Sequence, residues 1–246
     1  MLRRFSQFAL IIPTLNEAGN ITSVLDRAVS ALSHVEPPWE ILVVDDESND
    51  GTAQTVDRYG ASEPRVRLVT RAGQRGLAGA ITYGWAQTDA DLIGVMDADL
   101  QHPPELLPNL IAAVANGADL AIASRYAAGG SVENWNWARK AVSRVAVSAS
   151  RPVQKQILKV KDPMSGFFIV RRECIAGLEF QPTGFKLLLE ILSKGRIDSV
   201  AEVPFTFAAR HSGASKANAM TAVHYFVLLY KLSRSLISGS RNRPCS

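Results

Sequence analysis

The chain has 246 residues, of which 47% are hydrophobic, and it carries a formal net charge of +4. This length suits one well-buried domain of the larger kind, or a domain with a short appendage, and argues against two domains of equal size. The charge suits anionic partners such as phosphates, anionic lipid or nucleic acid, and a solvated basic surface explains it as well. Two widely separated cysteines, Cys174 and Cys245, argue against a disulfide framework or a zinc site.

The N-terminal segment MLRRFSQFALIIP has arginines before a short apolar run, as a secretory signal does. Pro13 interrupts the run, Asn16 and Glu17 follow it, and a small-residue cleavage pattern is missing. We therefore interpret residues 8–13 as the first strand, and we expect the protein on the cytoplasmic side of a membrane.

Further apolar runs of strand length occupy residues 40–44, 66–69, 92–96 and 120–123. Between them lie segments of helical period, for example residues 21–32 and the stretch that follows Pro103 and Pro104. Strands that alternate with helices predict an α/β fold with a mostly parallel central sheet and flanking helices on both faces. In such sheets ligands bind beyond the carboxyl ends of the strands.

Polar residues cluster where the predicted strands end. The series is Asn16 and Glu17, then Asp45 and Asp46, then Asp97 and Asp99, then Arg125. Asp and Asn also cap helices, but double and alternate acids exceed what one cap requires. The sequence therefore predicts that these strand ends converge on one cleft.

The segment MDADLQHPP has the residue types of a magnesium or manganese site. These ions prefer oxygen ligands and take one or two carboxylates together with phosphate oxygens and water. Asp97, Asp99 and Gln101 are spaced two apart, so all three face one side if extended geometry persists past Met96. A dinucleotide-binding dehydrogenase needs GxGxxG at the first turn, where this chain has TLNE, and no GKS or GKT of a P-loop occurs.

Two segments predict amphipathic helices. Residues 134–161 contain tryptophans, valines, seven basic residues and no acid. They indicate a basic helix or helix pair at a membrane interface, or a core pair whose Trp135 and Trp137 pack inward. Residues 217–237 form the other stretch, whose uncharged part is shorter than the roughly 20 residues of a bilayer span, so we expect no transmembrane helix.

The chain resembles the family 2 inverting glycosyltransferases, and within them the dolichol-phosphate or polyprenol-phosphate mannose synthases. The matching stretches are IIPTLNE, VVDDESNDGT, GLAGAITYGW, MDADLQHPP, ASRY, DPMSGFFIVRR, GFKLLLEIL and EVPFTFAARHSGASK. The resemblance implies a single Rossmann-like domain of the GT-A type at residues 1–216, with the basic insert at about 134–161. An amphipathic helix and tail would follow at residues 217–246.

The resemblance also implies roles for individual residues. Asp97, Asp99, Arg125 and Arg210 would be catalytic, and Asp99 and Gln101, with Asp97, would hold the metal. Arg125 and Arg139 would bind the acceptor phosphate. The sugar nucleotide would be bound by Pro13, Leu15, Glu17, Val44, Asp46, Asp97, Ala98, Asp99, Gln101, Lys186, Arg210 and Lys216. Leu15 stands where a tyrosine is common, so base stacking is weaker there.

Simpler roles stay open for several of these cations. Arg125 could form a salt bridge across the cleft, and Lys186 could open a helix without touching substrate. Arg210 and Lys216 belong to a loop rich in glycine and serine, which is either a lid over the diphosphate or a flexible surface loop.

The reaction implied is transfer of mannose from GDP-mannose to a polyprenyl monophosphate, with inversion and with Mg²⁺ or Mn²⁺. The acceptor phosphate is already anionic at neutral pH, since its second pKa is near 6, so a general base is not required. A saccharide hydroxyl would need a base, for which Asp162 and Glu190 are the candidates.

Three alternatives remain at this point: transfer from UDP-glucose or another sugar nucleotide, transfer to a saccharide hydroxyl, and a non-catalytic nucleotide-sugar-binding subunit. A nucleic-acid-binding role is disfavoured because the basic segment has no recognition motif. We expect a membrane surface as partner, with a membrane-anchoring subunit left open.

Overall fold

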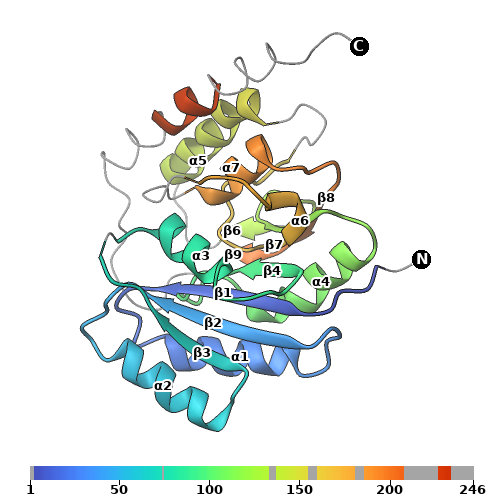
Figure 1. Cartoon of the computed structure of the whole chain (residues 1–246). Helices are drawn as coiled ribbons and strands as arrows, with labels where there is room; N and C mark the ends of the chain where they lie inside the picture. The colour runs from blue at the N-terminus through green and yellow to red at the C-terminus, as the bar shows by residue number, and fades with distance from the viewer. Residues whose placement is uncertain are drawn as a thin grey trace.

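The computed structural model describes residues 3–73, 75–132, 137–154, 160–180, 186–207 and 227–233, except for the side chains of residues 137–143. Its centre is a seven-stranded sheet in the order β3-β2-β1-β4-β7-β5-β8 (Figure 1). The strands are β1 (Phe8–Thr14), β2 (Trp39–Asp45), β3 (Val66–Thr70), β4 (Leu92–Val95), β5 (Leu120–Ser124), β7 (Phe168–Arg171) and β8 (Val200–Pro204). Only β7 runs antiparallel to its neighbours, so the prediction of a mostly parallel sheet is confirmed.

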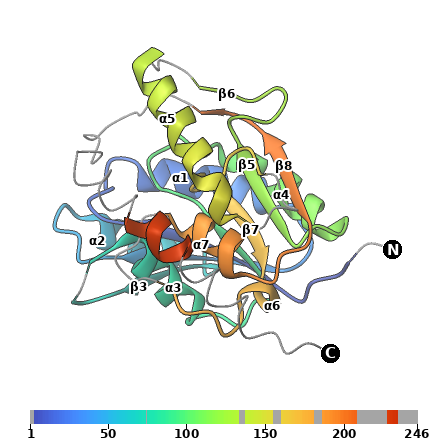
Figure 2. The same ribbon diagram turned by 90° about the horizontal axis from the view of Figure 1, so that it is seen from above.

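Helices cover both faces of the sheet, as the alternating pattern predicts. One face carries α1 (Ile21–Leu32), α2 (Thr52–Ser62), the 3₁₀ turn η1 (Pro104–Leu106) and α4 (Leu107–Ala115). The other face carries α3 (Leu77–Trp85), α6 (Arg172–Ile175) and α7 (Leu187–Lys194). A small parallel pair, β6 (Ser131–Val132) with β9 (Thr206–Phe207), lies beyond the end of β5 (Figure 2).

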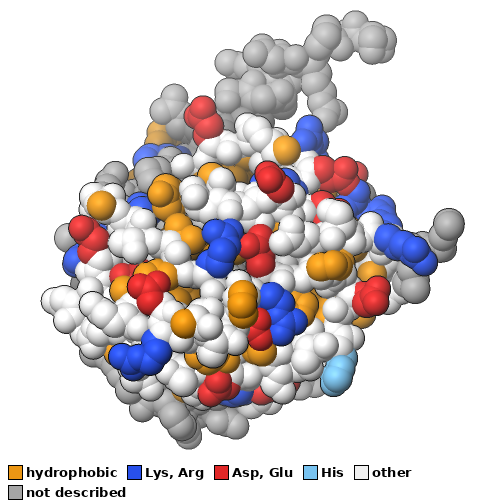
Figure 3. Space-filling model, turned by 60° about the horizontal axis from the view of Figure 1, so that its bottom comes forward, with side chains coloured by type: hydrophobic (Ala, Val, Ile, Leu, Met, Phe, Trp, Pro, Cys, Tyr) orange, Lys and Arg blue, Asp and Glu red, His pale blue; other side chains and the backbone are white. Residues whose placement is uncertain are grey.

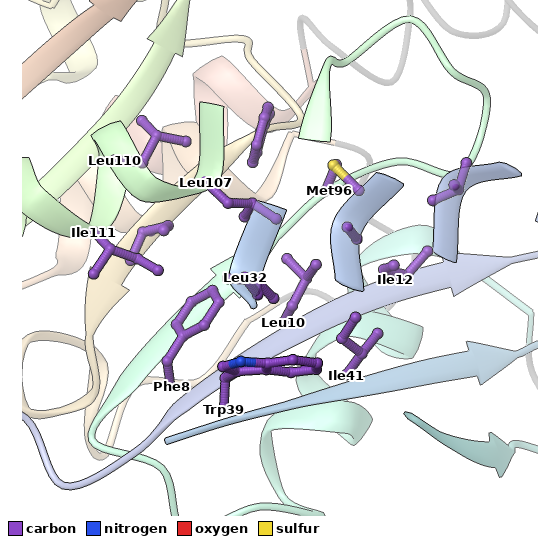
Figure 4. Packing of buried hydrophobic residues seen from close by; sticks show 14 of the residues in the cluster. Phe8, Leu10, Ile12, Leu32, Trp39, Ile41, Met96, Leu107, Leu110 and Ile111 are labelled. Atoms are coloured by element: carbon purple, nitrogen blue, oxygen red, sulfur yellow. The ribbon is translucent and has the colours of Figure 1, made fainter. Parts of the chain in front are cut away.

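Strand β1 shows why its sequence is a continuous apolar run. All seven of its residues are buried, and alternate side chains point to opposite faces of the sheet. Phe8, Leu10 and Ile12 pack against α1 and α4 (Figure 4), whereas Ala9 and Ile11 pack against α3. A strand covered on both faces cannot alternate polar with apolar residues, and β1 therefore occupies the middle of the molecule.

The sheet changes its direction of growth at β1, which lies between β2 and β4. In open α/β sheets the crevice at such a switch point, beyond the carboxyl ends of the strands, is the usual ligand site. Strand β4 ends at Val95, before the expected end at Met96, and Leu100 has a positive φ of 60°. The segment of Asp97, Asp99 and Gln101 is therefore a turn, and the expectation of continued extended geometry is wrong.

The segments predicted as amphipathic are described in part. Helix α5 (Trp137–Ser150) and the 3₁₀ turn η2 (Arg151–Val153) cover much of the basic insert. Near the C-terminus residues 227–233 are helical, and Leu228 and Leu232 pack there with Val153 and Leu189. Within the described ranges, none of the helices is long and apolar enough to cross a bilayer.

Candidate functional site

Three neighbouring loops at the carboxyl edge of the sheet adopt an unusual backbone conformation. Asn16 after β1, Glu47 after β2 and Leu100 after β4 have φ values of 60°, 56° and 60°. Among the described residues other than glycine, these are the only ones with positive φ. Such a conformation is uncommon for residues with a side chain and concentrates at functional sites, where surrounding contacts hold it in place.

The loops after β1 and β2 are joined by short hydrogen bonds. Asp45 Oδ1 accepts from Thr14 Oγ1 at 2.9 Å and from Ser48 Oγ at 2.6 Å. Ser48 Oγ in turn accepts from the backbone amide of Asn16 at 2.8 Å, and Asn16 Oδ1 accepts from the amide of Asn49 at 3.0 Å. Asp45 therefore organises the two loops, while its neighbour Asp46 faces a different partner.

Asp46 is held by an arginine that follows β3. Arg71 Nε lies 2.7 Å from Asp46 Oδ1, and Arg71 Nη2 lies 2.7 Å from Oδ2. The backbone amide of Gly76 also donates to Oδ2, at 3.0 Å. This two-pronged pair fixes the plane of the Asp46 carboxylate, which is expected to bind the nucleoside. Of the other residues expected there, Pro13 and Val44 are buried, and Glu17 accepts a 2.9 Å hydrogen bond from Asn20.

The turn after β4 carries the residues expected to hold a metal. Asp99 Oδ1 accepts from the backbone amide of Gln101 at 3.1 Å, which closes the turn around Leu100. Asp97 retains 34% exposure of its side chain, whereas Ala98 and Gln101 are buried. A Cβ built on Gly166 would lie 2.5 Å from Asp97 Oδ2, so only glycine gives this carboxylate its room.

The donor set of this turn fits a hard divalent cation. Asp97 and Asp99 contribute carboxylate oxygens and Gln101 an amide oxygen, which is the chemistry that Mg²⁺ and Mn²⁺ prefer. Within the described part of the chain there is no cluster of three or more His, Cys, Asp or Glu side chains suited to a metal. Two carboxylates suffice for Mg²⁺, which usually completes its shell with substrate phosphates and water.

Arg125, directly after β5, forms a buried ion pair across the site. Its Nε and Nη2 donate to Asp162 Oδ2 and Oδ1 at 2.8 and 2.7 Å, and its backbone amide donates to Oδ2 at 3.0 Å. The Asp162 side chain has no exposed surface. Glu202 on β8 receives the amides of Lys161 and Asp162 at 3.1 Å. The salt bridge considered from the sequence is therefore present, and it sets the guanidinium beside Asp97. Burial alone would lower the pKa of Arg125, but the hydrogen bonds to Asp162 and the charge of Asp162, with a smaller contribution from Asp97, raise it.

Lys186 and His102 complete the charged surroundings of Asp97. Burial, followed by the nearby charge of Arg125, lowers the pKa of Lys186 to about 8. Burial also lowers the pKa of His102 to about 4, and its Nδ1 lies 3.8 Å from Asp97 Oδ2. The ring of His102 packs among Phe167, Phe205 and Phe207. The structure thus brings two cationic side chains and a neutral imidazole around the carboxylate turn.

Three of the expected cations cannot be located at this site. Arg139 lies on α5, but its side chain belongs to those that the structure does not describe, and Arg210 and Lys216 lie outside the described residues. Their assignments stay predictions.

The profile of the family described as "Glycosyl transferase family 2" matches residues 9–178, more than half of the chain. The chain belongs to glycosyl transferase family 2. The match includes the strand-end loops with Asp46, Asp97, Asp99 and Arg125, together with the Asp162–Gly166 segment. The family suggested by the ordered motifs is therefore confirmed.

Curated relatives bear names that agree with this membership. The "Dolichol-phosphate mannosyltransferase" of Pyrococcus furiosus is 43% identical over 92% of this chain and 63% of that protein. This chain thus spans less than two thirds of that relative's length. The "Polyprenol monophosphomannose synthase" of Mycolicibacterium smegmatis is 35% identical over 95% of this chain and 88% of that protein.

Solved structures share the fold at lower identity. The glucosyl-3-phosphoglycerate synthase of Mycobacterium tuberculosis, solved with Mn²⁺, UDP-glucose and phosphoglyceric acid, matches with a TM-score of 0.69 and 21% identity. The match covers 93% of this chain and 80% of that one. The mannosyl-3-phosphoglycerate synthase of Rubrobacter xylanophilus gives a TM-score of 0.68 at 17% identity, over 97% and 77% of the two chains. These similarities show the shared fold.

Sequence reasoning missed several residues of the site. Arg71 is one of many basic residues, and nothing in its own segment marks it as the partner of Asp46. Gly166 lies in the recognised stretch DPMSGFF, where the close approach to Asp97 is a matter of tertiary packing. His102 follows Gln101 directly, so its position beside the DxD turn was the one signal that could have drawn attention to it.

Proposed function

We propose that this protein transfers a mannosyl residue from GDP-mannose to the phosphate of a polyprenyl monophosphate, with inversion at the anomeric carbon. Membership of glycosyl transferase family 2 and the names of the curated relatives support this reaction. The dolichol-phosphate mannosyltransferases of Mycosarcoma maydis and Saccharomyces cerevisiae are 32% and 31% identical, each over 92% of this chain.

One observation favours a phosphate acceptor over a hydroxyl acceptor. Both carboxylates that the sequence offers as a general base are fully buried and already engaged in ion pairs. Asp162 holds Arg125 on both oxygens, and Glu190 Oε2 lies 2.7 Å from Lys194 Nζ. A hydroxyl acceptor needs a base within hydrogen-bond reach, whereas a phosphate monoester with a second pKa near 6 is already an anionic nucleophile.

The residues of the site would then act by binding and by charge. Asp97, Asp99 and Gln101 would hold Mg²⁺ or Mn²⁺, which when bound offsets the negative charge of the departing diphosphate. Asp46, Glu17, Pro13, Val44 and Leu15 would line the nucleoside position. Arg125 and Lys186 would place positive charge where acceptor phosphate and donor diphosphate approach each other, so that the rate arises from positioning and electrostatic stabilisation. Arg139, Arg210 and Lys216 are proposed for the same phosphates.

A donor panel tests this function. The protein is incubated with a polyprenyl phosphate, with Mg²⁺ or Mn²⁺, and with GDP-mannose, UDP-glucose or other nucleotide sugars, and the lipid product is identified by mass spectrometry. We expect mannosyl-phosphoryl-polyprenol from GDP-mannose, and loss of product when the metal is chelated. A glucosyl lipid formed from UDP-glucose alone would overturn the donor and favour the alternative sugar specificity.

The protein is proposed to act at a membrane surface, on the cytoplasmic side. Large hydrophobic side chains are exposed at Val145 of α5 and at Val227 and Tyr230 of the helical segment 227–233. The basic side chains of Arg144 on α5 and Lys231 on segment 227–233 are also exposed, as is Arg151 in η2 directly after α5. Helix α5 and segment 227–233 lie side by side (Figures 1 and 2). Exposed apolar groups among basic ones suit an anionic lipid surface.

Co-sedimentation with vesicles tests the membrane surface. The protein should pellet with vesicles that contain anionic lipid and should be released at high salt, because screening weakens exposed charges. Equal sedimentation with neutral vesicles, or none with either, would contradict the proposal. Attachment through a membrane-anchoring subunit stays open beside direct binding.

Nucleic acid is not proposed as a partner. On the side of the molecule where α1 and α2 lie, basic and acidic side chains are interspersed (Figure 3). Arg27 pairs with Glu105, and Arg65 pairs with Glu63, so the charges there offset one another. Nucleic-acid sites instead concentrate basic residues on one face.

A further inference from the structure

Arg71 is a cation of the site that no motif assigns, and it is joined to a carboxylate expected to bind the nucleoside. We propose that Arg71 is a nucleoside-positioning residue: it fixes the Asp46 carboxylate so that Oδ1 accepts a hydrogen bond from a hydroxyl or N–H group of the bound nucleoside. This inference rests on the proposed function, because it requires a sugar nucleotide to bind at Asp46.

The pair has the geometry of a rigid, two-pronged contact. Both of its hydrogen bonds measure 2.7 Å, and the side chains of Arg71 and Asp46 are only 13% and 7% exposed. Short charge-assisted bonds in parallel fix orientation as well as distance, which a single ammonium group cannot do. Asp46 therefore has one defined orientation before any ligand arrives.

A count of acceptor positions shows what Asp46 can still offer. A carboxylate has about four lone-pair positions on its two oxygens. Oδ2 accepts from Arg71 Nη2 and from the Gly76 amide, whereas Oδ1 accepts from Arg71 Nε. Among contacts with the described residues, Oδ1 of Asp46 uses one of its two lone-pair positions, and the second can accept a hydrogen bond from a single donor group of a ligand.

The surrounding backbone holds both partners in register. The amide of Arg71 donates to the carbonyl of Asp45 at 2.9 Å, and the amide of Asp46 donates to the carbonyl of Thr14 at 3.0 Å. Arg71 Nη2 also donates to the carbonyl of Gly76 at 3.2 Å, which ties down the start of α3. Loops after β1, β2 and β3 are thus fixed together at Asp46.

A second arginine–carboxylate pair, which joins β2 and β3 at the protein surface, differs from the Arg71–Asp46 pair in geometry and exposure. Arg67 on β3 pairs with Glu40 on β2, near the opposite end of the strands, and its side chain is 47% exposed. Both guanidinium nitrogens contact the same oxygen, Oε2, at 3.2 and 3.0 Å. This pair is looser, lies away from the carboxyl edge, and supplies a control.

The test replaces Arg71 and measures nucleotide binding separately from transfer. Arg71→Lys keeps the charge but loses the two-pronged contact. We expect the Kd for the nucleoside diphosphate GDP, measured by calorimetry with Mn²⁺, and the donor KM to rise about 10- to 100-fold, as when a hydrogen bond to a charged group is lost. The acceptor KM and kcat should change less than about twofold, because the lost contact binds the nucleotide equally well before and during the reaction.

Two controls separate positioning from folding. Arg67→Lys weakens the exposed pair with Glu40. Arg171→Lys weakens the part-buried pair with Asp119, whose exposure is similar to that of Arg71 and Asp46. Both should leave the GDP Kd within about twofold of wild type. Should Arg71→Lys fail to fold, Arg71→Gln gives the same readout, because Asp46 stays in place and the glutamine amide cannot reproduce the two-pronged contact.

The outcomes also separate this inference from the proposed function. Wild-type protein that binds neither GDP nor UDP would contradict the proposed function itself. If wild type binds GDP and the Arg71 variants bind it within about twofold, the function stands and the positioning role is wrong. A loss of thermal stability without any change in the Kd would likewise show that Arg71 is only structural.

Discussion

The two halves of the candidate site are organised in different ways. The nucleoside half, formed by the loops after β1, β2 and β3, is joined by polar contacts between neighbouring strand ends, such as Thr14–Asp45–Ser48 and Asp46–Arg71. The transfer half, formed by the turn after β4, Arg125, the Asp162–Gly166 segment and Lys186, brings together segments far apart in sequence. Its central contact is the Arg125–Asp162 pair.

This difference indicates what each half does. The nucleoside half is a preformed site, because contacts with loop neighbours already hold its carboxylates in place. The transfer half holds its cations close to Asp97 in a buried setting, where charge interactions are stronger than in water. We therefore expect substitutions in the first half to change nucleotide affinity, and substitutions in the second half to change turnover or acceptor affinity.

The largest effect should come from the turn after β4. Asp99→Asn removes a carboxylate proposed to hold the metal, and we expect kcat/KM to fall about 1,000-fold, as for loss of a central electrostatic group. Steady-state assays with varied Mn²⁺ measure it. Asp89→Asn, an exposed acid before the amino end of the same strand, is the matched control and should retain wild-type activity. Equal activity of both variants would remove Asp99 from the mechanism.

The contact between Gly166 and Asp97 should matter next. Gly166→Ala places a Cβ 2.5 Å from Asp97 Oδ2, and the carboxylate must shift. We expect kcat/KM to fall about 100-fold, since displacement of about 1 Å in an active site has this cost. In Gly60→Ala the new Cβ meets the carbonyl of Val66 at 2.7 Å, far from the site, so it should lower the Tm and leave kcat/KM unchanged. Full activity of Gly166→Ala would disprove the positional role of Asp97.

The Arg125–Asp162 pair should affect the acceptor rather than the nucleotide. Asp162→Asn leaves a buried guanidinium without its carboxylate, so we expect about 3 kcal/mol less unfolding free energy and an acceptor KM about tenfold higher. Denaturant titrations and acceptor saturation curves measure these changes. Asp119→Asn disrupts the pair with Arg171 before the amino end of β5 and should lower stability alone. A rise in donor KM instead would assign Asp162 to the nucleoside half.

The smallest effect is a pH dependence specific to the transfer half. With a pKa of about 8, Lys186 loses its proton above that pH, so kcat/KM should fall about tenfold per pH unit from about 8 upward. An unfolded lysine keeps its proton to about pH 10.5, so the unfolded state binds more protons between pH 8 and 10.5. Stability from this group therefore rises with pH while activity falls.

Lys186→Arg tests whether the fall of kcat/KM above pH 8 is due to Lys186. The guanidinium stays charged throughout, so the alkaline decline of kcat/KM should move above pH 10. A decline that stays near pH 8 in this variant would assign the titration to another group.

Local pattern made the strands and helices predictable. The run at residues 8–13 became β1 because a strand buried on both faces is apolar throughout, and the helical periods correspond to α1 and α4. The acids at the strand ends were recognisable because parallel strands end at one edge. The extended geometry expected for Asp97–Gln101 was wrong, since Leu100 turns the chain immediately after β4.

Long-range pairing was beyond the reach of sequence pattern. The antiparallel strand β7 lies between β4 and β5 although it comes after both in the chain, and only tertiary packing decides that position. The same holds for Arg71 with Asp46 and for Gly166 with Asp97, because each contact depends on how two loops meet. The ion pair of Glu190 with Lys194 is different, since it joins residues four apart on α7 and is a local helix contact.

A competition between acceptors tests the central claim, that this site transfers mannose to a lipid phosphate. The protein is given GDP-mannose, Mn²⁺, and equal concentrations of a polyprenyl phosphate, 3-phosphoglycerate and a soluble saccharide, and all products are measured by mass spectrometry. The account predicts mannosyl-phosphoryl-polyprenol as the dominant product. Mannosyl transfer mainly to 3-phosphoglycerate or to the saccharide hydroxyl, with the lipid unmodified, would contradict it.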